Sequence, residues 1–263
     1  MKKRIFGLLV VLGLMTSLMA CGKKEAIEGD RTDEIFERGY LVMGMDDTFA
    51  PMGFRDEKGN LVGFDVDIAQ EVFDEIGIEV RFQPVDWNMK ETELNSGNID
   101  LIWNGYSVTD KRKEEVNFSD VYLSNKQIIG VMEDSSIRSK EDLEDKKVAM
   151  QSQSSALEAV NKEPELVEKF DSGEPVLFDT NHEAIMDLEA GRSDAVVVDE
   201  VLFRYYIGQK GADKYRVLED DFGEEVYAVG LRKSDEKLLA RINESLEAIR
   251  ENGKYDKIYS KWF

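Results

Sequence analysis

The chain has 263 residues, with 55 acidic against 34 basic side chains and a formal net charge of -21. Nucleic acid needs a basic surface on its partner, so this balance argues against a nucleic-acid-binding function. Cys21 is the single cysteine, which excludes an internal disulfide, and the folded part must be held together by its apolar core.

Residues 1–20 have the order of a secretory signal peptide: three basic residues, the apolar run "IFGLLVVLGLM", then "LMAC" with small Ala20 before Cys21. The run is too short for a secure membrane span. "LMAC" resembles a bacterial lipobox, which implies cleavage before Cys21 and a diacylglycerol lipid on its thiol. A plain cleaved signal with an unrelated cysteine is the alternative. Residues 21–34 are then predicted to be the lipidated cysteine and a flexible stalk.

Strand-like and helix-like segments alternate in the next part of the chain. The pattern predicts a buried strand over 40–45, a helix over 67–77 that Gly77 ends, and a strand over 78–85. A helix over 89–97 and the strand "DLIW" follow. This βαβ order predicts an α/β fold with a mostly parallel sheet flanked by helices.

The same order then begins again. Strands are predicted at "KQIIGVM", "KKVAMQ", "PVLF" and "DAVVVD", with helices between them, and a last strand "EVYAVGLRK" leads to a helix over about 235–252. Two successive α/β units predict two lobes. We place the first part of lobe 1 at 35–125, lobe 2 at 126–226 and a return to lobe 1 at 227–263.

The residues that usually carry catalysis are scarce. His182, the one histidine, stands at a helix start where a solvated surface role is typical. The chain lacks the GxSxG, HExxH and Walker motifs and any Cys/His cluster. No catalytic residue, cofactor or metal is therefore predicted. The adjacent pair Asp46 and Asp47 could do acid/base chemistry, but such pairs at strand ends are more often solvated.

The stretch "NGYSVTDKR" places an arginine just after a strand in an acidic chain. Thr109 is positioned to cap a short helix, and Arg112 is then directed toward the strand end, where α/β proteins bind ligands. A guanidinium group binds a carboxylate through two parallel hydrogen bonds. The alternative is a solvated Arg112. Asp199, which ends the strand "AVVVD", is either an acceptor for a cation or the N-cap of the next helix.

Four stretches carry a resemblance to a known family: "LVGFDVDIAQEV", "LNSGNIDLIWNGYSVTDKRKEEVNFSDVYL", "GRSDAVVVDE" and "GKYDKIYSKWF". They closely resemble the extracellular solute-binding proteins of polar amino-acid ABC transporters, from about residue 39 to residue 263. The resemblance implies a two-lobed periplasmic-binding-protein-like fold of type II with a ligand cleft between the lobes. It also implies that Arg112 binds the carboxylate of an amino acid and Asp199 its ammonium group.

The resemblance implies further ligand contacts. Phe49 and Trp87 match aromatic walls, with a plain core role as the alternative for each. From their charge, Asp46 and Asp47 near Phe49 favour a cationic or amide side chain unless they are merely solvated loop residues. The other matching positions are Asn104, Gly105 and Ser107 at a strand end and Ser154 and Ser155 at a helix start. Two departures stand out: Gln153 replaces a common glycine, and Val121 replaces a common proline.

The resulting expectation is a lipid-anchored, monomeric receptor outside the cell membrane that captures a polar or charged L-amino acid and delivers it to an ABC permease. Two alternatives remain open at this point. One is a cleft enzyme resembling cyclohexadienyl dehydratase, and the other is a surface amino-acid sensor module with the same fold.

Overall fold

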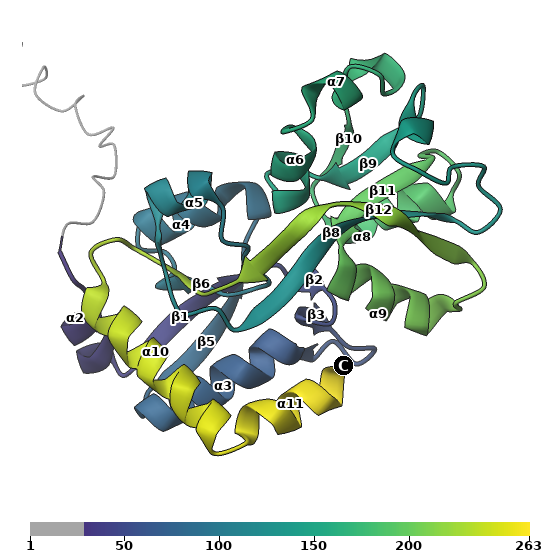
Figure 1. Ribbon diagram of the computed structural model, residues 1–263. Coiled ribbons are helices and arrows are strands. Elements are labelled where there is room, and N and C mark those ends of the chain that lie inside the picture. The colour runs from purple at the N-terminus through teal and green to yellow at the C-terminus, as the bar shows by residue number, and fades with distance from the viewer. Residues whose placement is uncertain (1–28) are drawn as a thin grey trace, which may run out of the picture.

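The computed structural model describes residues 29–263. The predicted signal peptide, Cys21 and the first part of the predicted stalk lie outside the described residues. The described chain forms two lobes joined by long strands that run between them (Figure 1). None of its helices is both long enough and apolar enough to cross a membrane.

Lobe 1 is built on a five-stranded sheet in the order β5-β1-β6-β13-β7. Its strands are β1 (Tyr40–Met45), β5 (Glu79–Pro84), β6 (Leu101–Ile102), β7 (Asn117–Phe118) and β13 (Gly230–Leu231). A small sheet beside it contains β2 (Thr48–Phe49), β3 (Gly53–Arg55) and β4 (Leu61–Val62). The helices of this lobe are α2 (Thr32–Arg38), α3 (Phe64–Ile76), η1 (Trp87–Met89), α4 (Lys90–Asn95), α5 (Asp110–Glu115), α10 (Glu236–Glu251) and α11 (Lys254–Trp262).

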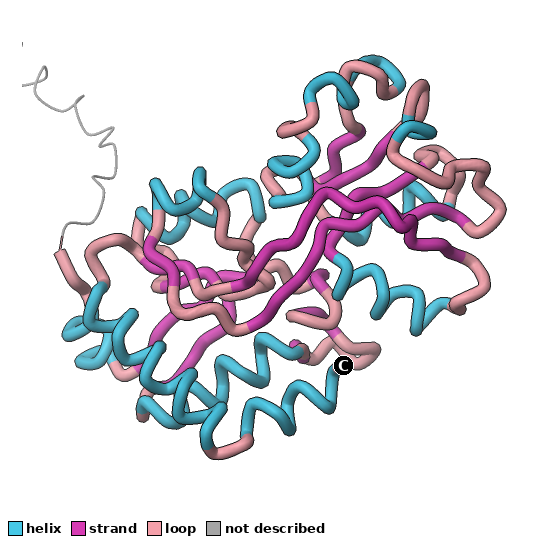
Figure 2. Tube along the Cα trace, viewed as in Figure 1, coloured by secondary structure: helices cyan, strands magenta, loops and turns pink. Residues whose placement is uncertain are grey.

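Lobe 2 has its own five-stranded sheet in the order β10-β9-β11-β8-β12. Its strands are β8 (Leu123–Met132), β9 (Val148–Gln151), β10 (Val176–Phe178), β11 (Ala195–Asp199) and β12 (Tyr215–Tyr227). Helices cover both faces of the sheet (Figure 2). They are η2 (Glu141–Leu143), α6 (Ser155–Val160), α7 (Pro164–Val167), η3 (Asp171–Gly173), α8 (Asn181–Glu189) and α9 (Glu200–Lys210).

Both sheets are mixed rather than mostly parallel. In lobe 1, β1 pairs in parallel with β5 and β6, whereas β13 is antiparallel to β6 and β7. In lobe 2, β9 pairs in parallel with β10 and β11, whereas β8 is antiparallel to β11 and β12. The antiparallel pairs come from strands that enter a sheet from the other lobe without a crossover helix, which the βαβ pattern did not reveal.

The chain passes between the lobes along β8 and β12, which pair from Leu123 opposite Tyr227 to Met132 opposite Tyr215. The end of β12 and the residue after it also bond to lobe 1: Val108 N–H donates to Val226 O at 2.9 Å, and Ala228 N–H donates to Tyr106 O at 3.1 Å. The two lobes therefore share a continuous hydrogen-bonded ribbon, which lets them rotate about it without unfolding.

The predicted stalk extended to residue 34, but α2 already begins at Thr32. Asp30 Oδ1 accepts a hydrogen bond from Thr32 N–H at 2.8 Å, and Arg31 N–H donates to Asp235 Oδ1 at 2.9 Å. These long-range and capping bonds fasten the chain to α10 before the expected boundary. The folded part of lobe 1 thus starts slightly earlier than the polar composition indicated.

Two of the predicted helices bury apolar residues that recur at helical spacing. Ile68, Val72 and Phe73 of α3 are fully buried, and α3 packs on α10. The stripe Leu238, Ile242, Leu246 and Ile249 of α10 is buried with at most 1% exposure. Each fully buried side chain of this kind contributes about 1.5–3 kcal/mol to folding.

We predict opposite effects for two glycine-to-alanine substitutions. A Cβ on Gly130 of β8 would lie 2.4 Å from the buried ring of Phe203, whereas one on Gly208 of α9 would meet nothing within 4 Å. Gly130→Ala should lower the free energy of unfolding by about 1–3 kcal/mol through overpacking. Gly208→Ala should raise it by about 0.5–1 kcal/mol through helix propensity. Urea unfolding measures both, and equal effects would contradict this packing of β8 on α9.

Candidate ligand-binding site

A cavity lies between the lobes and brings together nearly all residues that the sequence singled out. Its lining is Asp46, Phe49, Trp87, Asn104, Gly105, Arg112, Gln151, Ser154, Ser155 and Asp199. Of the predicted set, Ser107 lies just behind the lining, and Gln151 was not predicted. The cavity volume is about 10 Å³, which is about the room for one water molecule. The lobes are therefore closed on each other here and must move apart to admit a larger ligand.

Arg112 reaches the cavity from α5. Thr109 Oγ1 accepts a hydrogen bond from Arg112 N–H at 3.2 Å, which confirms the predicted cap. The guanidinium is 3% exposed and stacks on Tyr106 with its central carbon 4.5 Å from the ring centre. It donates to Ser107 O at 3.0 Å and to Gln153 O of lobe 2 at 3.3 Å. Arg112 is therefore a buried cation of the cleft rather than a solvated residue of the helix.

Lys90 is a second buried cation beside Arg112, and sequence reasoning missed it. It is 1% exposed, and its Nζ donates to Trp87 O at 3.0 Å and to Gln153 O at 3.3 Å. Burial, followed by the nearby charge of Arg112, lowers the pKa of Lys90 to about 8. A lysine in a helix is usually exposed to solvent. The one sequence feature that indicates a buried Lys90 is its spacing of three residues from Trp87.

Gln153, the departure from the family pattern, does not line the cavity. Its backbone has a φ of +53°, in the left-handed region that favours glycine. In that conformation its carbonyl accepts from both Arg112 and Lys90 across the cleft. The side chain points outward, where Lys111 Nζ lies 3.5 Å from Oε1. Gln153 is thus the point of lobe 2 on which the cations of lobe 1 converge.

Asp199 provides a buried carboxyl group on the lobe 2 side. All three of its hydrogen bonds go to Oδ1, from Asn125 Nδ2 at 2.8 Å, Gln127 Nε2 at 3.0 Å and Tyr227 Oη at 2.5 Å, which leaves Oδ2 for another donor. Burial, followed by the nearby Glu225 carboxyl, raises the pKa of Asp199 well above its ordinary value.

The alternative role for Asp199 as a helix cap is not realised. Its side chain makes no capping hydrogen bond to α9. Asn125 of β8 supplies that bond instead, since its Oδ1 accepts from Val201 N–H at 3.2 Å. Asn125 and Gln127 were both missed, although their spacing of two on a strand places them on one face.

Asp46 marks the other end of the cavity and is 7% exposed. Its Oδ1 accepts from Thr48 N–H at 2.8 Å and Thr48 Oγ1 at 2.6 Å, and its Oδ2 accepts from Gln151 Nε2 of lobe 2 at 3.3 Å. Burial raises the pKa of Asp46 despite these bonds. Asp47 differs, because it pairs with Arg55 at 2.7 Å outside the cavity.

Amides surround this end of the cavity. Asn104 Oδ1 accepts from Asp46 N–H at 3.0 Å, while Asn104 Nδ2 is buried without a hydrogen-bond partner among residues 29–263. Gln151 Oε1 accepts from Asn181 Nδ2 at 2.9 Å. The region therefore presents polar atoms, one of them an unpaired donor.

Two aromatic side chains form walls of the cavity. Phe49 is 6% and Trp87 7% exposed, and Trp87 packs edge-on against Tyr106 at 6.0 Å. Gly105 is required beside Phe49, because its φ is +54° and a Cβ would lie 2.7 Å from that ring. Trp103 is fully buried against Phe73 and is not part of the cavity lining.

Three serines lie next to the cavity, and a hydrogen bond between two of them joins the lobes. Ser107 Oγ of lobe 1 donates to Ser155 Oγ of lobe 2 at 2.9 Å. Ser154 is the N-cap of α6, since its Oγ accepts from Leu157 N–H at 3.1 Å. Ser107 contributes through this bond and through its carbonyl, which holds Arg112.

Asp65 supports the site from behind. It is fully buried in α3, and its Oδ2 accepts from Gly105 N–H at 2.7 Å and from Tyr122 Oη at 2.9 Å. Burial raises its pKa to about 7. Its other oxygen, Oδ1, has no hydrogen-bond partner in the described part of the chain. Asp65 thus holds the loop that carries Asn104, Gly105 and Ser107.

Metal-binding residues are not grouped in this structure: residues 29–263 contain no cluster of three or more His, Cys, Asp or Glu side chains arranged to hold an ion. His182, at the start of α8, is exposed to solvent as expected.

Two α/β lobes joined by paired strands, with a polar cavity where they meet, define a two-lobed binding protein of the periplasmic type. The family model for bacterial extracellular solute-binding proteins, family 3, matches residues 41–263. The chain belongs to this family.

Three similar proteins illustrate the relationship. L-cystine-binding protein TcyJ of Escherichia coli (strain K12) is 28% identical over 268 residues, covering 100% of this chain and 98% of that protein. The crystal structure of an ABC uptake transporter substrate-binding protein from Streptococcus pneumoniae with bound histidine is 38% identical, with a TM-score of 0.87, covering 89% of this chain and 96% of that one. An ancestral arginine-binding protein bound to arginine is 40% identical, with a TM-score of 0.79 and coverages of 86% and 99%.

We predict a pH-dependent stability that Asp65 causes. The folded state keeps a proton on Asp65 up to about pH 7, whereas the ordinary value is 3.8, so raising the pH between these values favours unfolding. Relative to Asp65→Asn, the wild-type free energy of unfolding should fall by about 1.4 kcal/mol per pH unit in that window.

Urea titrations at several pH values measure this slope. Asp74→Asn, an exposed change on the same helix, is the control and should keep the wild-type slope. Parallel curves for wild type and Asp65→Asn would contradict the assignment.

Proposed function

We propose that the protein is the amino-acid receptor of an ABC importer, which closes its two lobes around an L-amino acid and delivers it to the membrane permease. The observation that carries this proposal is the placement of a buried arginine and a buried aspartate on opposite lobes of one cavity. Removing each charge of an amino-acid zwitterion from water costs several kcal/mol unless it meets a partner.

Arg112 would bind the ligand carboxylate and Asp199 its ammonium group. The guanidinium has five N–H donors and uses two hydrogen bonds on backbone carbonyls, so donors remain for a carboxylate. Asp199 Oδ2 is available for an ammonium N–H. Ser154 and Ser155 at the start of α6 would add donors near the carboxylate, while Asn104, Gly105 and Ser107 shape the opposite side.

The cargo side chain would lie between Phe49 and Trp87 and reach toward Asp46. Asp46 accepts hydrogen bonds and Gln151 is held beside it, so a side chain that donates hydrogen bonds suits this end. We infer a cationic or amide side chain. The bound histidine and arginine named for two similar structures are cationic or hydrogen-bond-donating ligands of this kind.

The setting of the receptor is also part of the proposal. We infer a monomer that is anchored to the outer face of the cell membrane by a lipid on Cys21, after removal of residues 1–20. We further propose functional boundaries at 35–125, 126–226 and 227–263. The pairing of β8 with β12, where those boundaries fall, supports them.

We predict that the folded protein gains thermal stability with one or a few amino acids. A ligand that binds only the native state raises stability by about 2.7 kcal/mol at a hundred times its dissociation constant. Refolded residues 22–263 would be melted with each common amino acid and cystine. Arg112→Ala should weaken binding by about 3–5 kcal/mol, because it leaves a buried carboxylate unpaired.

Lys113→Ala, an exposed change on the same helix, is the matched control and should leave affinity unchanged. A loss of less than about tenfold in Arg112→Ala would contradict the proposed role. If no amino acid raises the melting temperature of the folded protein, amino-acid capture is contradicted. Consumption of prephenate or arogenate would then favour the alternative of a cleft enzyme that resembles cyclohexadienyl dehydratase.

We predict that Lys90 stabilises the closed state without touching the ligand. Lys90→Met keeps the buried chain length but removes the bond to Gln153 O. Because a hydrogen bond from a charged group contributes about 1.5–3 kcal/mol, the variant should bind about tenfold or more weakly, through faster dissociation. Stopped-flow fluorescence measures both rates. Lys113→Met, an exposed change whose ion pair with Asp110 stays within lobe 1, is the control, and a Lys90→Met protein with wild-type dissociation would contradict the prediction.

A further inference from the structure

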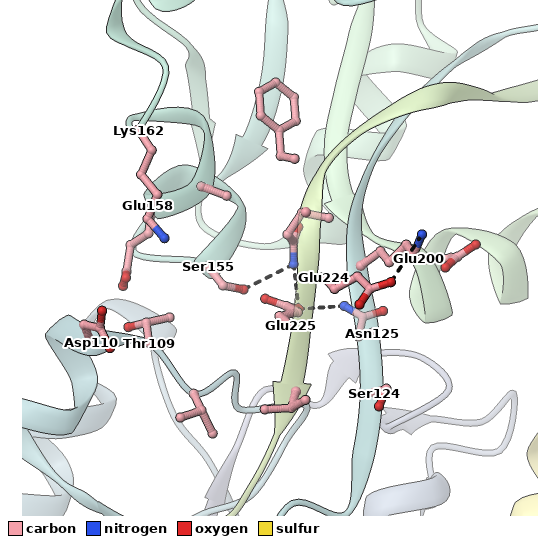
Figure 3. A pocket seen from close by; sticks show the side chains of 17 residues that line it. Thr109, Asp110, Ser124, Asn125, Ser155, Glu158, Lys162, Glu200, Glu224 and Glu225 are labelled. Carbon is pink, nitrogen blue, oxygen red and sulfur yellow. Dashed lines mark hydrogen bonds and ion pairs between the residues drawn. The ribbon is translucent and has the colours of Figure 1, made fainter.

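Glu225 of β12 forms a pair with Asp199 that the proposed receptor mechanism has not used. Glu225 Oε1 accepts from Asn125 Nδ2 at 2.6 Å and from Gln127 Nε2 at 2.8 Å. The same two nitrogens donate to Asp199 Oδ1 at 2.8 and 3.0 Å. Figure 3 shows Glu225 bonded to Asn125, with Ser155 nearby. Two carboxyl groups are thus held on one pair of amides.

The pair has a different environment on each side. Asp199 lines the enclosed cavity between the lobes. Glu225 lines a second, open cavity together with Asn125, Gln127 and Ser155 and is half-buried. The two amide side chains therefore form a partition, with one carboxyl group toward the ligand and the other toward solvent.

No cation within the described residues neutralises this pair, since neither carboxyl group has a lysine or arginine nitrogen within the 4.0 Å of an ion pair. The surrounding cations have other partners: Lys126 of β8 pairs with Asp221 and Glu224, Arg204 of α9 with Glu200, and Arg112 lies 3.9 Å from Glu158 of α6. The remaining charged groups that face the two cavities are Asp46, Asp110 and Lys162. The titratable hydroxyl of Tyr227 donates to Asp199 Oδ1 at 2.5 Å.

Because Asp199 and Glu225 share the same two amide donors, ionising both carboxyl groups costs more free energy than ionising each one alone. Burial is the first cause, and Glu225 the second, of the raised pKa of Asp199. Neighbouring carboxyl groups of this kind titrate as a pair, with one proton held to a higher pH than either group would hold it alone. The pair lacks a cationic partner, and the ammonium group of an amino acid is such a partner.

We propose that Asp199 and Glu225 share one proton while the cavity is empty, and that binding of a ligand ammonium group releases this proton to solvent. The inference rests on the proposed receptor function. The pair then changes from one negative charge to two as the ammonium brings one positive charge. The proton leaves through Glu225, which faces the open cavity. Capture of the amino acid is therefore coupled to proton release.

This coupling makes affinity depend on pH in one direction. While the empty pair holds its proton, each unit of falling pH weakens binding by up to tenfold, because one proton competes with one ligand. Above the pH at which the empty pair has lost its proton, affinity becomes constant.

Isothermal titration calorimetry counts the released protons. The amino acid found in the thermal panel is titrated into the wild-type protein at about pH 5 to about pH 8, in buffers of low and high ionisation enthalpy. We expect release of roughly one proton per ligand at the lower pH values. Glu225→Gln keeps an acceptor for both amides, so it should still bind but release close to none. Glu224→Gln changes the adjacent, exposed carboxylate and should release as many protons as wild type.

The infrared spectrum of the empty protein tests the pair without any ligand. The carbonyl band of a protonated carboxyl group should be present in wild type and in Glu224→Gln, and reduced in Glu225→Gln. Buffer-independent heats in wild type, or equal proton release in both variants, would overturn the proposal. If no amino acid binds, the receptor function fails, and an unchanged carbonyl band in Glu225→Gln separately overturns the shared proton.

Discussion

The cost of removing a charge from water governs the arrangement of this cleft. Arg112 and Asp199 are 3% and 5% exposed, respectively, and neither has an opposite charge in direct hydrogen-bonded contact. Arg112 is held by carbonyls and an aromatic ring, and Asp199 by amides and a hydroxyl group. A zwitterion placed between them would satisfy both charges at once. Because they come from different lobes, that stabilisation is available only when the lobes are together.

The strands that join the lobes also build half of the site. Asn125 and Gln127 lie on β8, and Glu225 and Tyr227 lie on β12, where the two strands pair between the lobes. All four surround Asp199. A rotation about this ribbon and a change of charge on Asp199 therefore affect the same residues. On the opposite side, Lys90 and Arg112 meet a single carbonyl of Gln153, so closure is held at both ends of the cleft.

Sequence patterns predicted the parts of the site that follow local rules. Arg112 lies on a short helix that a capping threonine begins, Asp199 ends an apolar strand and Gly105 comes shortly after another strand. The α3 and α10 stripes follow helical spacing. The patterns did not find Lys90, Gln127 or Glu225. Residues of these types are usually exposed to solvent. Contact of α4 with lobe 2 buries Lys90, and the pairing of β8 with β12 brings Gln127 and Glu225 together. The mixed sheets were missed for the same reason, since strand direction depends on which lobe a strand comes from.

The proposed closure needs both charges of one amino acid to hold the lobes together. Small-angle X-ray scattering of the protein with its cargo amino acid, and with the deaminated and decarboxylated analogues of that amino acid, tests it most directly. We expect the radius of gyration to fall only with the complete amino acid, because each analogue leaves either Arg112 or Asp199 without its partner. An equal decrease with either analogue at saturation would contradict closure by the two charges together.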